Sequence, residues 1–396
     1  MSGFECSTFL WKDQQRKNYI ALTGHDKRFG EDCDNVKSLG IAVQREAIPW
    51  PFVDKGNGRY DWSEVDRAAD ALSECDITPI WDLFHYGLPD GCNPLEDDCR
   101  KRFVDYAAAA AQRVLPKIKT TPFFTPVNEI TFFSGACTDM AWMYPFAKGK
   151  YADMKRSLCR MAIDAAKAIR EIEPKSRFVH VDPIIHAVPP KDRPDLADEA
   201  WNHAYEQAYE AWDMLGGLQA PELGGAMEIL DIVGVNVYHF SQAQMNADGS
   251  REVLGPQDER RKPLSELLQF AWDRYHRPLI IGETSGYQDK RADWLRMTME
   301  ECFKALNSGV DLQGVCLYPI VDIPDWNSGE WARIGMYDIE DTDTCERIPH
   351  GPYIDELRRW QKILDQPEHI ESDEGRVELD EVRRHAREYA QKVSLK

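Results

Sequence analysis

Two glutamates stand where apolar segments of the chain end, and their positions suggest acid–base chemistry. Glu129 directly follows the segment at 122–128, and Glu283 ends the segment at 278–283. A buried carboxylate is unfavourable unless it is paired or used, so two of them at such ends point to a functional site. Two carboxyl groups facing each other across a pocket suit cleavage of a glycosidic bond. One donates a proton to the leaving oxygen, and the other attacks the sugar carbon.

A buried ion pair is the alternative explanation for each glutamate. Arg45, in the sequence VQRE, ends another apolar segment and is a candidate partner for such a carboxylate. The same arginine would also serve the chemical interpretation, because its positive charge would hold Glu283 ionised. The residues alone leave both explanations open.

Eight apolar segments recur along the chain and predict the strands that position these residues. They cover residues 4–9, 40–48, 78–85, 122–128, 177–183, 229–238, 278–283 and 314–319. Several of them, such as ILDIVGVNVY and RPLIIGE, lack polar alternation, as expected for parallel strands buried on both faces. Helical patterns lie between the strands and begin at Ser63, Asp98, Met154, Leu196, Leu264 and Arg291.

This alternation predicts the α/β class and a single (β/α)8 TIM barrel over residues 1–365. A doubly wound open sheet is the alternative, but no glycine-rich phosphate loop follows any strand. Functional residues of a barrel lie at the carboxyl ends of its strands. Glu129 and Glu283, at the ends of the fourth and seventh predicted strands, would therefore meet at the open end of the barrel. Residues 366–396 are dense in charge, which predicts a C-terminal tail or surface helix.

Composition narrows the function classes. The chain has 396 residues, 43% of them hydrophobic, which is enough for a full core and excludes a disordered or collagen-like protein. The 48 basic and 68 acidic residues give a net charge of −20. Such a surface repels phosphate backbones and anionic lipid, so we expect neither nucleic acid nor membrane as a partner.

Cysteine usage bears on the cellular compartment. Ten cysteines are spread along the chain with no CxxC pair, and the first residues lack the order of a signal peptide. We therefore expect reduced thiols and a cytoplasmic location.

The sequence around the two glutamates resembles glycoside hydrolase family 1. FTPVNEI at 124–130 is similar to that family's Thr-Phe-Asn-Glu-Pro segment, and WDLFHYGLPDG at 81–91 to its Leu-Phe-His-Trp-Asp-Leu-Pro motif. DIVGVNVYH at 231–239 resembles Asp-Phe-Ile-Gly-Ile-Asn-Tyr-Tyr, and RPLIIGETSG at 277–286 resembles Pro-Ile-X-Ile-Thr-Glu-Asn-Gly. Together with Arg45, these motifs follow the family order from strand two to strand seven. The resemblance implies a divergent member of clan A, whose barrels cleave glycosides with retention.

The resemblance also implies a role for each matching residue. Glu129 corresponds to the acid/base and Glu283 to the nucleophile. Tyr238 would donate a hydrogen bond to the nucleophile, and Arg45 would be its charge partner. The residues that would bind the sugar are Asn128 at the 2-hydroxyl, His85 at another hydroxyl, and Glu5, which stands near the position where the family's first strand has a sugar-binding glutamine.

Several positions depart from the family pattern. Ile130 stands where the family usually has a proline after the acid/base. The eighth predicted strand ends in Tyr318-Pro319, where the family has a tryptophan that lies beneath the bound sugar. Asp325-Trp326 only echoes the family's Glu-Trp pair, which makes Trp326 a candidate sugar contact. Proline at position 319 lowers the free-energy difference between cis and trans. We therefore predict a cis bond before it, with the Tyr318 ring in the pocket floor.

A metal site is the alternative function to consider for the polar residues at the end of the fifth predicted strand. His180, Asp182 and His186, in VHVDPIIH, could mimic metal ligands. The first strand carries no His-X-His, so the usual ligand set of a metal-dependent barrel hydrolase is incomplete. We expect no metal and no cofactor.

These observations predict a retaining β-glycosidase, exo-acting on β-glucoside- or β-galactoside-like substrates. A transglycosidase that uses the same two glutamates is one alternative, because the choice of acceptor depends on the loops. A sugar-binding barrel without turnover is another, although retention of both glutamates argues against it. The sequence predicts a carbohydrate partner but no oligomeric state.

Overall fold

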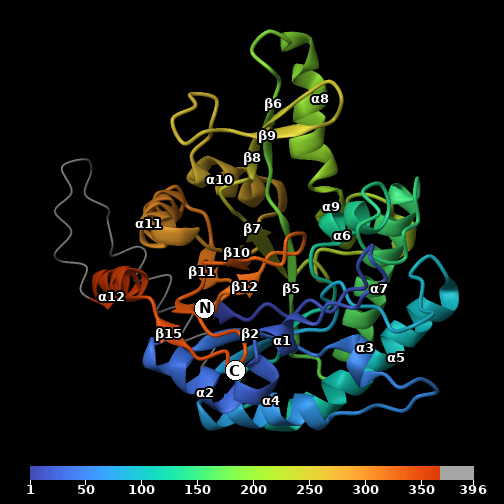
Figure 1. Ribbon diagram of the computed structural model, residues 1–396. Helices are drawn as coiled ribbons and strands as arrows, with labels where there is room; N and C mark the ends of the chain where they lie inside the picture. Colours follow the sequence, from blue (N-terminus) through green and yellow to red (C-terminus); the bar gives the residue numbers. More distant parts are fainter. Residues whose placement is uncertain (366–396) are drawn as a thin grey trace.

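A computed structural model describes residues 1–365 and shows a closed parallel barrel of eight strands (Figure 1). Around the barrel the strands follow the order β1-β11-β10-β7-β5-β4-β3-β2. Their bounds are β1 Ser2–Gly3, β2 Val43–Ala47, β3 Thr78–Asp82, β4 Phe123–Thr125, β5 Arg177–Pro183, β7 Ile232–Asn236, β10 Leu279–Thr284 and β11 Leu312–Leu317. The predicted (β/α)8 barrel is confirmed, and the tail predicted over 366–396 lies outside the described residues.

Strands β5, β7 and β10 are apolar because nearly all of their residues are buried. Every residue of β7 and β10 is buried, because both faces of the barrel wall are covered. Ile281 pairs with Val235, and Glu283 pairs with Asn236 one step further along. Gly282 is required between them, since a Cβ there would lie 2.8 Å from the side chains of Asn236 and Val181. This close packing of β10 against β7 fixes the position of Glu283 along the strand.

Helices cover the outside of the barrel (Figure 1). They are α1 Tyr19–Leu22, α2 His25–Ser38, α3 Trp50–Val53, α4 Ser63–Glu74, α5 Asp97–Val114, α6 Ile130–Cys137, α7 Tyr151–Ile172, α8 Ala197–Trp201, α9 Glu210–Leu215, α10 Leu264–Tyr275, α11 Arg291–Asn307 and α12 Gly351–Asp365. Short 3-10 turns occur at Leu115–Lys117, Pro194–Leu196, Pro221–Leu223 and Gln288–Lys290. The helix expected from Leu196 is broken, because a π-helical stretch at Asn202–Gln207 separates α8 from α9.

The first strand differs from the prediction. Only Ser2 and Gly3 pair with their neighbours, whereas an apolar strand was expected over 4–9. Phe4 stacks on His25 with ring centroids 3.8 Å apart, and Phe9 packs against Trp11 and Trp326. The apolar character of this segment therefore reflects aromatic packing beyond the strand rather than pairing in the sheet.

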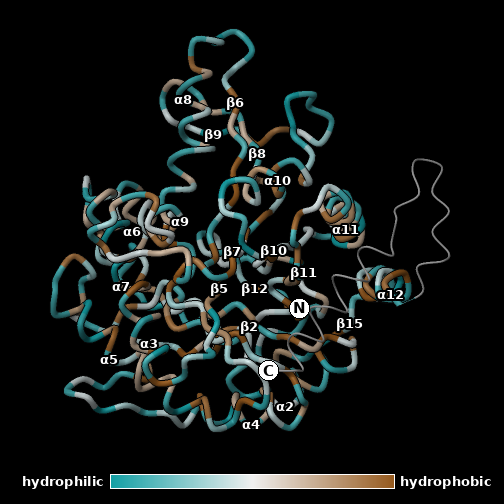
Figure 2. Tube along the Cα trace, turned by 180° about the vertical axis from the view of Figure 1, so that it is seen from behind, coloured by the Kyte–Doolittle hydropathy of each residue, from teal (hydrophilic) through white to brown (hydrophobic). Residues whose placement is uncertain are grey.

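A second, smaller sheet stands above β5 and β7. It joins β6 His186–Val188, β8 Gln242–Met245 and β9 Arg251–Val253, and with α8 it projects from the barrel (Figure 1). The loops of this projection are largely hydrophilic, as Figure 2 shows. After β11, two short pairs fold back over the barrel: β12 Ile323–Pro324 with β13 Trp331–Ala332, and β14 Tyr337–Asp338 with β15 Ile348–Pro349.

The prediction that all cysteines are reduced is wrong for one pair. Cys92 and Cys99 form a disulfide in the segment between β3 and α5, which brings their Cα atoms to 5.1 Å. Their spacing of seven residues is not a recognisable motif, and the bond was therefore not predicted. The other eight cysteines are free and buried. Among residues 1–365, no helix has the length and apolar character needed to span a membrane.

Candidate active site

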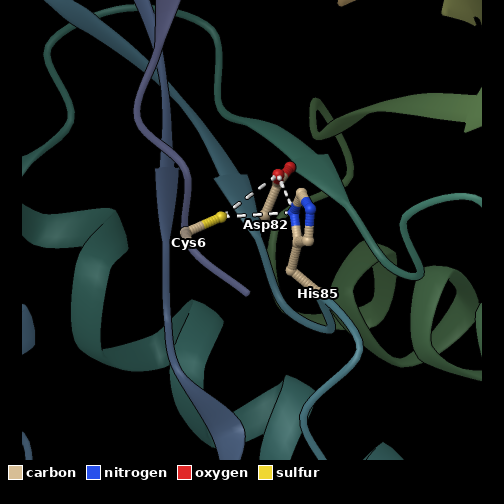
Figure 3. A group of neighbouring side chains, drawn as sticks. All are labelled: Cys6, Asp82 and His85. Carbon is tan, nitrogen blue, oxygen red and sulfur yellow. Dashed lines mark hydrogen bonds and ion pairs between the residues drawn. The ribbon is translucent and has the colours of Figure 1, made fainter. Parts of the chain in front are cut away.

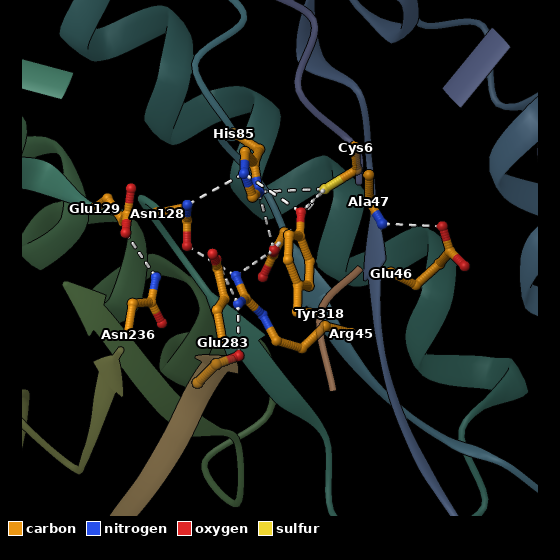
Figure 4. Close-up of polar contacts among 12 residues, drawn as sticks. Cys6, Arg45, Glu46, Ala47, His85, Asn128, Glu129, Asn236, Glu283 and Tyr318 are labelled. Carbon is orange, nitrogen blue, oxygen red and sulfur yellow. Dashed lines mark hydrogen bonds and ion pairs between the residues drawn. The ribbon is translucent and has the colours of Figure 1, made fainter. Parts of the chain in front are cut away.

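Glu283 lies at the end of β10, and both of its carboxylate oxygens accept hydrogen bonds. Figure 4 shows Glu283 beside Arg45. Arg45 Nη1 donates to Oε1 at 2.8 Å, and the Tyr238 hydroxyl donates to Oε2 at 2.9 Å. The carboxylate is only 5% exposed. One of the two donors carries a full positive charge, so the hydrogen bond from Arg45 is charge-assisted.

Arg45 joins several groups at the bottom of the site. Its Nη2 atom donates to Asp82 Oδ2 at 2.6 Å and to Asn128 Oδ1 at 2.8 Å. Burial alone would raise the pKa of Asp82, but the charge of Arg45 outweighs burial and holds that pKa below its usual value. Arg45 is therefore a fixed cation shared by two buried carboxylates, Asp82 and Glu283.

Glu129 has a different environment at the end of β4. It stands at the start of α6 with a left-handed backbone, φ 47°, and its backbone N–H donates to Val181 O at 2.9 Å. The Tyr86 hydroxyl donates to Oε2, and Asn236 Nδ2 donates to Oε1 at 2.7 Å. Neither donor is charged. Burial, followed by the charge of Glu283, raises the pKa of Glu129 to about 8, and the two hydrogen bonds oppose this rise.

Asp182 holds the helix that begins after Glu129. Both of its carboxylate oxygens accept from the backbone N–H of Thr131, at 3.1 and 3.0 Å, in the first turn of α6. Burial raises the pKa of Asp182 to about 7, while the bonds from Thr131 oppose the rise. The side chain thus has a clear structural role at the acid/base position.

The two histidines considered with Asp182 as metal ligands have partners of their own. His180 Nε2 contacts the backbone oxygen of Ile229 at 2.8 Å. His186 contacts the Tyr205 hydroxyl and the backbone oxygen of Arg260. The three side chains therefore face three different environments rather than one ligand position.

Asn128 and His85 bind each other, and this contact defines the histidine tautomer. Asn128 Oδ1 accepts from Arg45, so its Nδ2 is the atom that faces His85 Nε2 at 3.2 Å. Since Nδ2 is a donor, Nε2 must accept, and the ring proton lies on Nδ1. That nitrogen is 3.3 Å from Asp82 Oδ2 and 3.2 Å from Cys6 Sγ. His85 is therefore held between Asn128 on one side and Asp82 and Cys6 on the other.

Cys6, Asp82 and His85 form a buried group whose atoms lie within 4.8 Å of one another (Figure 3). Thiolate, imidazole and carboxylate are all ligands that zinc accepts. The carboxylate oxygen is already bonded to Arg45, however, and burial raises the pKa of the Cys6 thiol well above its usual value. The group is better suited to positioning His85 than to holding a dication beside a guanidinium.

Tyr318 lies beside His85 and Arg45, and the predicted cis bond to Pro319 is confirmed. Its ring lies parallel to that of His85 with centroids 6.0 Å apart, and Arg45 lies over it at 5.2 Å. The hydroxyl is 3.5 Å from His85 Nε2. Gly3 leaves the space for this ring, since a Cβ there would lie 2.4 Å from Tyr318 Cδ2.

Glu5 and Trp326 lie at the rim. Glu5 is 5% exposed and accepts from the backbone N–H of Ser7 at 3.1 Å. Trp326 is half-buried and packs against Phe9, Tyr86 and Phe132, with ring centroids 5.1 to 5.8 Å apart. It therefore forms an aromatic wall behind the tyrosine that bonds to Glu129.

Sequence reasoning missed four residues of this site: Cys6, Asp82, Tyr86 and Asn236. Three of them stand inside the motifs that carried the resemblance, in WDLFHYGLPDG and DIVGVNVYH. Their polar side chains at strand ends were the available signal. Which glutamate each would contact depends on the packing of strands that are distant in sequence.

Known proteins of similar sequence are glycosidases. The aryl-phospho-β-D-glucosidase BglC of Bacillus subtilis is 24% identical, with 82% of this chain and 84% of the relative aligned. A 6-phospho-β-galactosidase of Staphylococcus haemolyticus is 20% identical over 80% of this chain and 84% of its own length. β-Glucosidase A of Thermotoga maritima is 21% identical over 82% and 83%. No protein-family model matches the chain.

Solved structures give the same fold. A family 1 β-glucosidase of Thermotoga maritima superimposes with a TM-score of 0.72 at 19% identity, covering 86% of each chain. The complex of a Thermotoga maritima β-glucosidase with glucoimidazole has a TM-score of 0.73, also at 19% identity. The likeness extends over most of the barrel.

Proposed function

Since the chain is a divergent relative of the family 1 glycoside hydrolases of clan A, we propose that it acts as a retaining β-glycosidase with Glu129 as acid/base and Glu283 as nucleophile. The observation that carries this assignment is the unequal environment of the two glutamates. Glu283 is bonded to a guanidinium, whereas Glu129 is bonded only to neutral donors. The raised pKa of Glu129 suits the acid, and the hydrogen bond from a guanidinium suits Glu283 as the nucleophile.

In the first half of the reaction, ionised Glu283 attacks the anomeric carbon of the bound sugar. The bond from that carbon to the leaving oxygen breaks, and an ester bond to Glu283 forms. Protonated Glu129 delivers its proton to the leaving oxygen. A pKa of about 8 keeps Glu129 protonated at neutral pH, as this step requires.

In the second half, Glu129 acts as a base. Once Glu283 is esterified it has no charge, and that charge is one of the causes of the raised pKa of Glu129. The pKa of Glu129 then falls, and the carboxylate can take a proton from water. The water oxygen attacks the anomeric carbon, and Glu283 leaves as a carboxylate. Tyr86 and Asn236 remain in place to stabilise ionised Glu129.

We propose β-glucoside- or β-galactoside-like substrates cleaved from the non-reducing end. Tyr318, Asn128 and His85 would line the sugar subsite, with Trp326 behind Tyr86. Eight free cysteines support a cytoplasmic location, and the redox state of Cys92 and Cys99 in purified protein would test it.

A screen of nitrophenyl β-glycosides, with and without added acceptor sugars, tests the proposal. We expect release of nitrophenol from at least one glycoside and its loss in Glu283→Gln. Glu300→Gln, which changes an exposed carboxylate on α11, is the matched control and should keep full activity. Products longer than the substrate would identify transglycosylation. Absence of turnover on the whole panel would contradict the proposal.

A further inference from the structure

Glu5 presents a buried carboxylate to the sugar site without a cationic partner. It lies two residues beyond Gly3, and it is near enough to His85 and Glu283 for their charges to act on its carboxyl group. Its side chain is 5% exposed, and Ser7 is its hydrogen-bond partner. Within residues 1–365, no lysine or arginine forms an ion pair with it. Burial raises the pKa of Glu5, which reflects the unfavourable energy of ionising it there.

Glu5 has no cation bonded to it. Arg45 is the guanidinium of the site, and Asp82 and Glu283 already share it. The His85 ring is near enough to lower the pKa of Glu5, but burial outweighs this effect. Three carboxyl groups, Glu5, Asp82 and Glu283, therefore lie near a single guanidinium. This excess of acidic groups favours a ligand with a positive charge, which would bond to Glu5 in its ionised form.

This excess separates the chain from two of its relatives. The Bacillus and Staphylococcus proteins are named for phospho-sugar glycosides. A sugar phosphate carries a negative charge and would be repelled by a site with this balance. A neutral hydroxyl could bond to Glu5 but would leave its charge uncompensated.

Resting on the proposed function, we infer that Glu5 recognises a positively charged group on the sugar and that the substrate is a glycoside of an amino sugar. The position of the amine follows from the strand order. Tyr318, Arg45 and His85 stand on or directly after β11, β2 and β3, and Glu5 follows β1 in the middle of this arc. The bond to be cleaved lies between Glu129 and Glu283, so Glu5 faces the remote end of the ring, at carbon 3, 4 or 6.

Equilibrium binding tests this inference without requiring turnover. Calorimetry would compare glucose, glucose 6-phosphate and the 3-, 4- and 6-amino-deoxy glucoses with wild-type protein and Glu5→Gln. We expect at least one amino sugar to bind wild type about tenfold more tightly than glucose, as one charged hydrogen bond provides. Glu5→Gln should remove that preference and leave glucose binding within about threefold. Glucose 6-phosphate should bind more weakly than glucose.

The control is Glu300→Gln, which removes an exposed carboxylate on α11 and should keep the preference. Equal binding of amino sugars and glucose to wild type would overturn the inference, as would a preference that survives Glu5→Gln. If Glu5→Gln does not fold, the wild-type comparison still decides. Hydrolysis that depends on both glutamates, without any amine preference, would refute this inference alone. An amine preference in a protein that needs neither glutamate would refute the proposed function alone.

Discussion

Glu129 and Glu283 end strands of the same barrel, and both are almost fully buried, yet the regions around them differ in kind. Around Glu283, Arg45 and Tyr238 bond both carboxylate oxygens, and the guanidinium brings a full positive charge. Around Glu129, Tyr86 and Asn236 also bond both oxygens, but no charge accompanies them. Burial thus dominates at Glu129 and raises its pKa to about 8.

The difference teaches that burial alone does not assign a catalytic role. Two identical side chains with similar exposure, 8% and 5%, have different electrostatic environments because only one has a cationic hydrogen-bond donor. Arg45 comes from β2, which two other strands separate from β10 in the barrel. Its side chain nevertheless reaches the backbone oxygen of Gly282 and the carboxylate of Glu283 on β10. Changing the donors around each glutamate is therefore the way to test the account.

Removing the nucleophile should have the largest effect. We expect Glu283→Gln to lower kcat by at least about 10⁴-fold, because the amide cannot form the ester intermediate. The stability of this variant, followed by thermal unfolding, should stay close to that of wild type, since glutamine is of similar size. Activity near the wild-type level would show that Glu283 is not the nucleophile.

Removing the acid/base should have a large effect that depends on the leaving group. Glu129→Ala should slow hydrolysis of alkyl or nitrophenyl glycosides by about 10²- to 10⁴-fold, and of dinitrophenyl glycosides much less. Added azide should restore turnover of activated substrates and give a β-glycosyl azide, because the small anion needs no base. An equal loss for all leaving groups, with no effect of azide, would contradict the assignment.

A matched pair of tyrosine variants probes the two environments directly. Tyr86→Phe removes a hydrogen bond that opposes the raised pKa of Glu129, so that pKa should rise further. Because Glu129 must be protonated, kcat/KM of wild type should fall as pH rises through about 8. In Tyr86→Phe this fall should begin about one pH unit higher. Tyr238→Phe should lower kcat/KM about tenfold at all pH values without moving the fall.

The pH profiles of both variants, recorded with one nitrophenyl glycoside, check this pair. A shift caused by Tyr238→Phe, or no shift with Tyr86→Phe, would show that the two tyrosines do not act on separate glutamates. A merely structural role of Tyr86 would lower the rate without moving the profile.

The smallest effect on activity is expected for a change of Tyr318, which lies beside His85 and Arg45. Tyr318→Trp enlarges a ring that already lies against Gly3 and His85, so it should raise KM by a few-fold and change the order of preferred sugars. Measuring KM over the glycoside panel checks this. Unchanged substrate preference would refute the role of Tyr318 in the pocket.

The sequence allowed much of this site to be predicted where residues lie in contiguous motifs. Glu129 and Glu283 were predicted from their positions at the ends of apolar segments, and Asn128 and His85 from the resemblance of their motifs to a known family. The barrel itself follows from the alternation of strands and helices. The cis bond before Pro319 was also predictable from local chemistry.

The remaining features depend on contacts between distant segments. Asn236 bonds to Glu129 although it pairs along the strand with Glu283, and only the packed barrel shows this. The Cys92–Cys99 bond depends on the course of a loop, and the short first strand on aromatic packing outside the wall. Such contacts leave no periodic signal in one sequence.

The central claim is that Glu283 forms a covalent bond with the sugar while Glu129 serves as acid and base. Trapping tests it most directly: a 2-deoxy-2-fluoro glycosyl fluoride of the preferred sugar should inactivate the enzyme. The fluorine at carbon 2 slows both formation and breakdown of the intermediate, while the good fluoride leaving group keeps formation fast enough for the intermediate to accumulate. After digestion, mass spectrometry should find one fluoro-sugar on the peptide that contains Glu283. A label on Glu129 or another residue, or an inverted product released without labelling, would contradict the account.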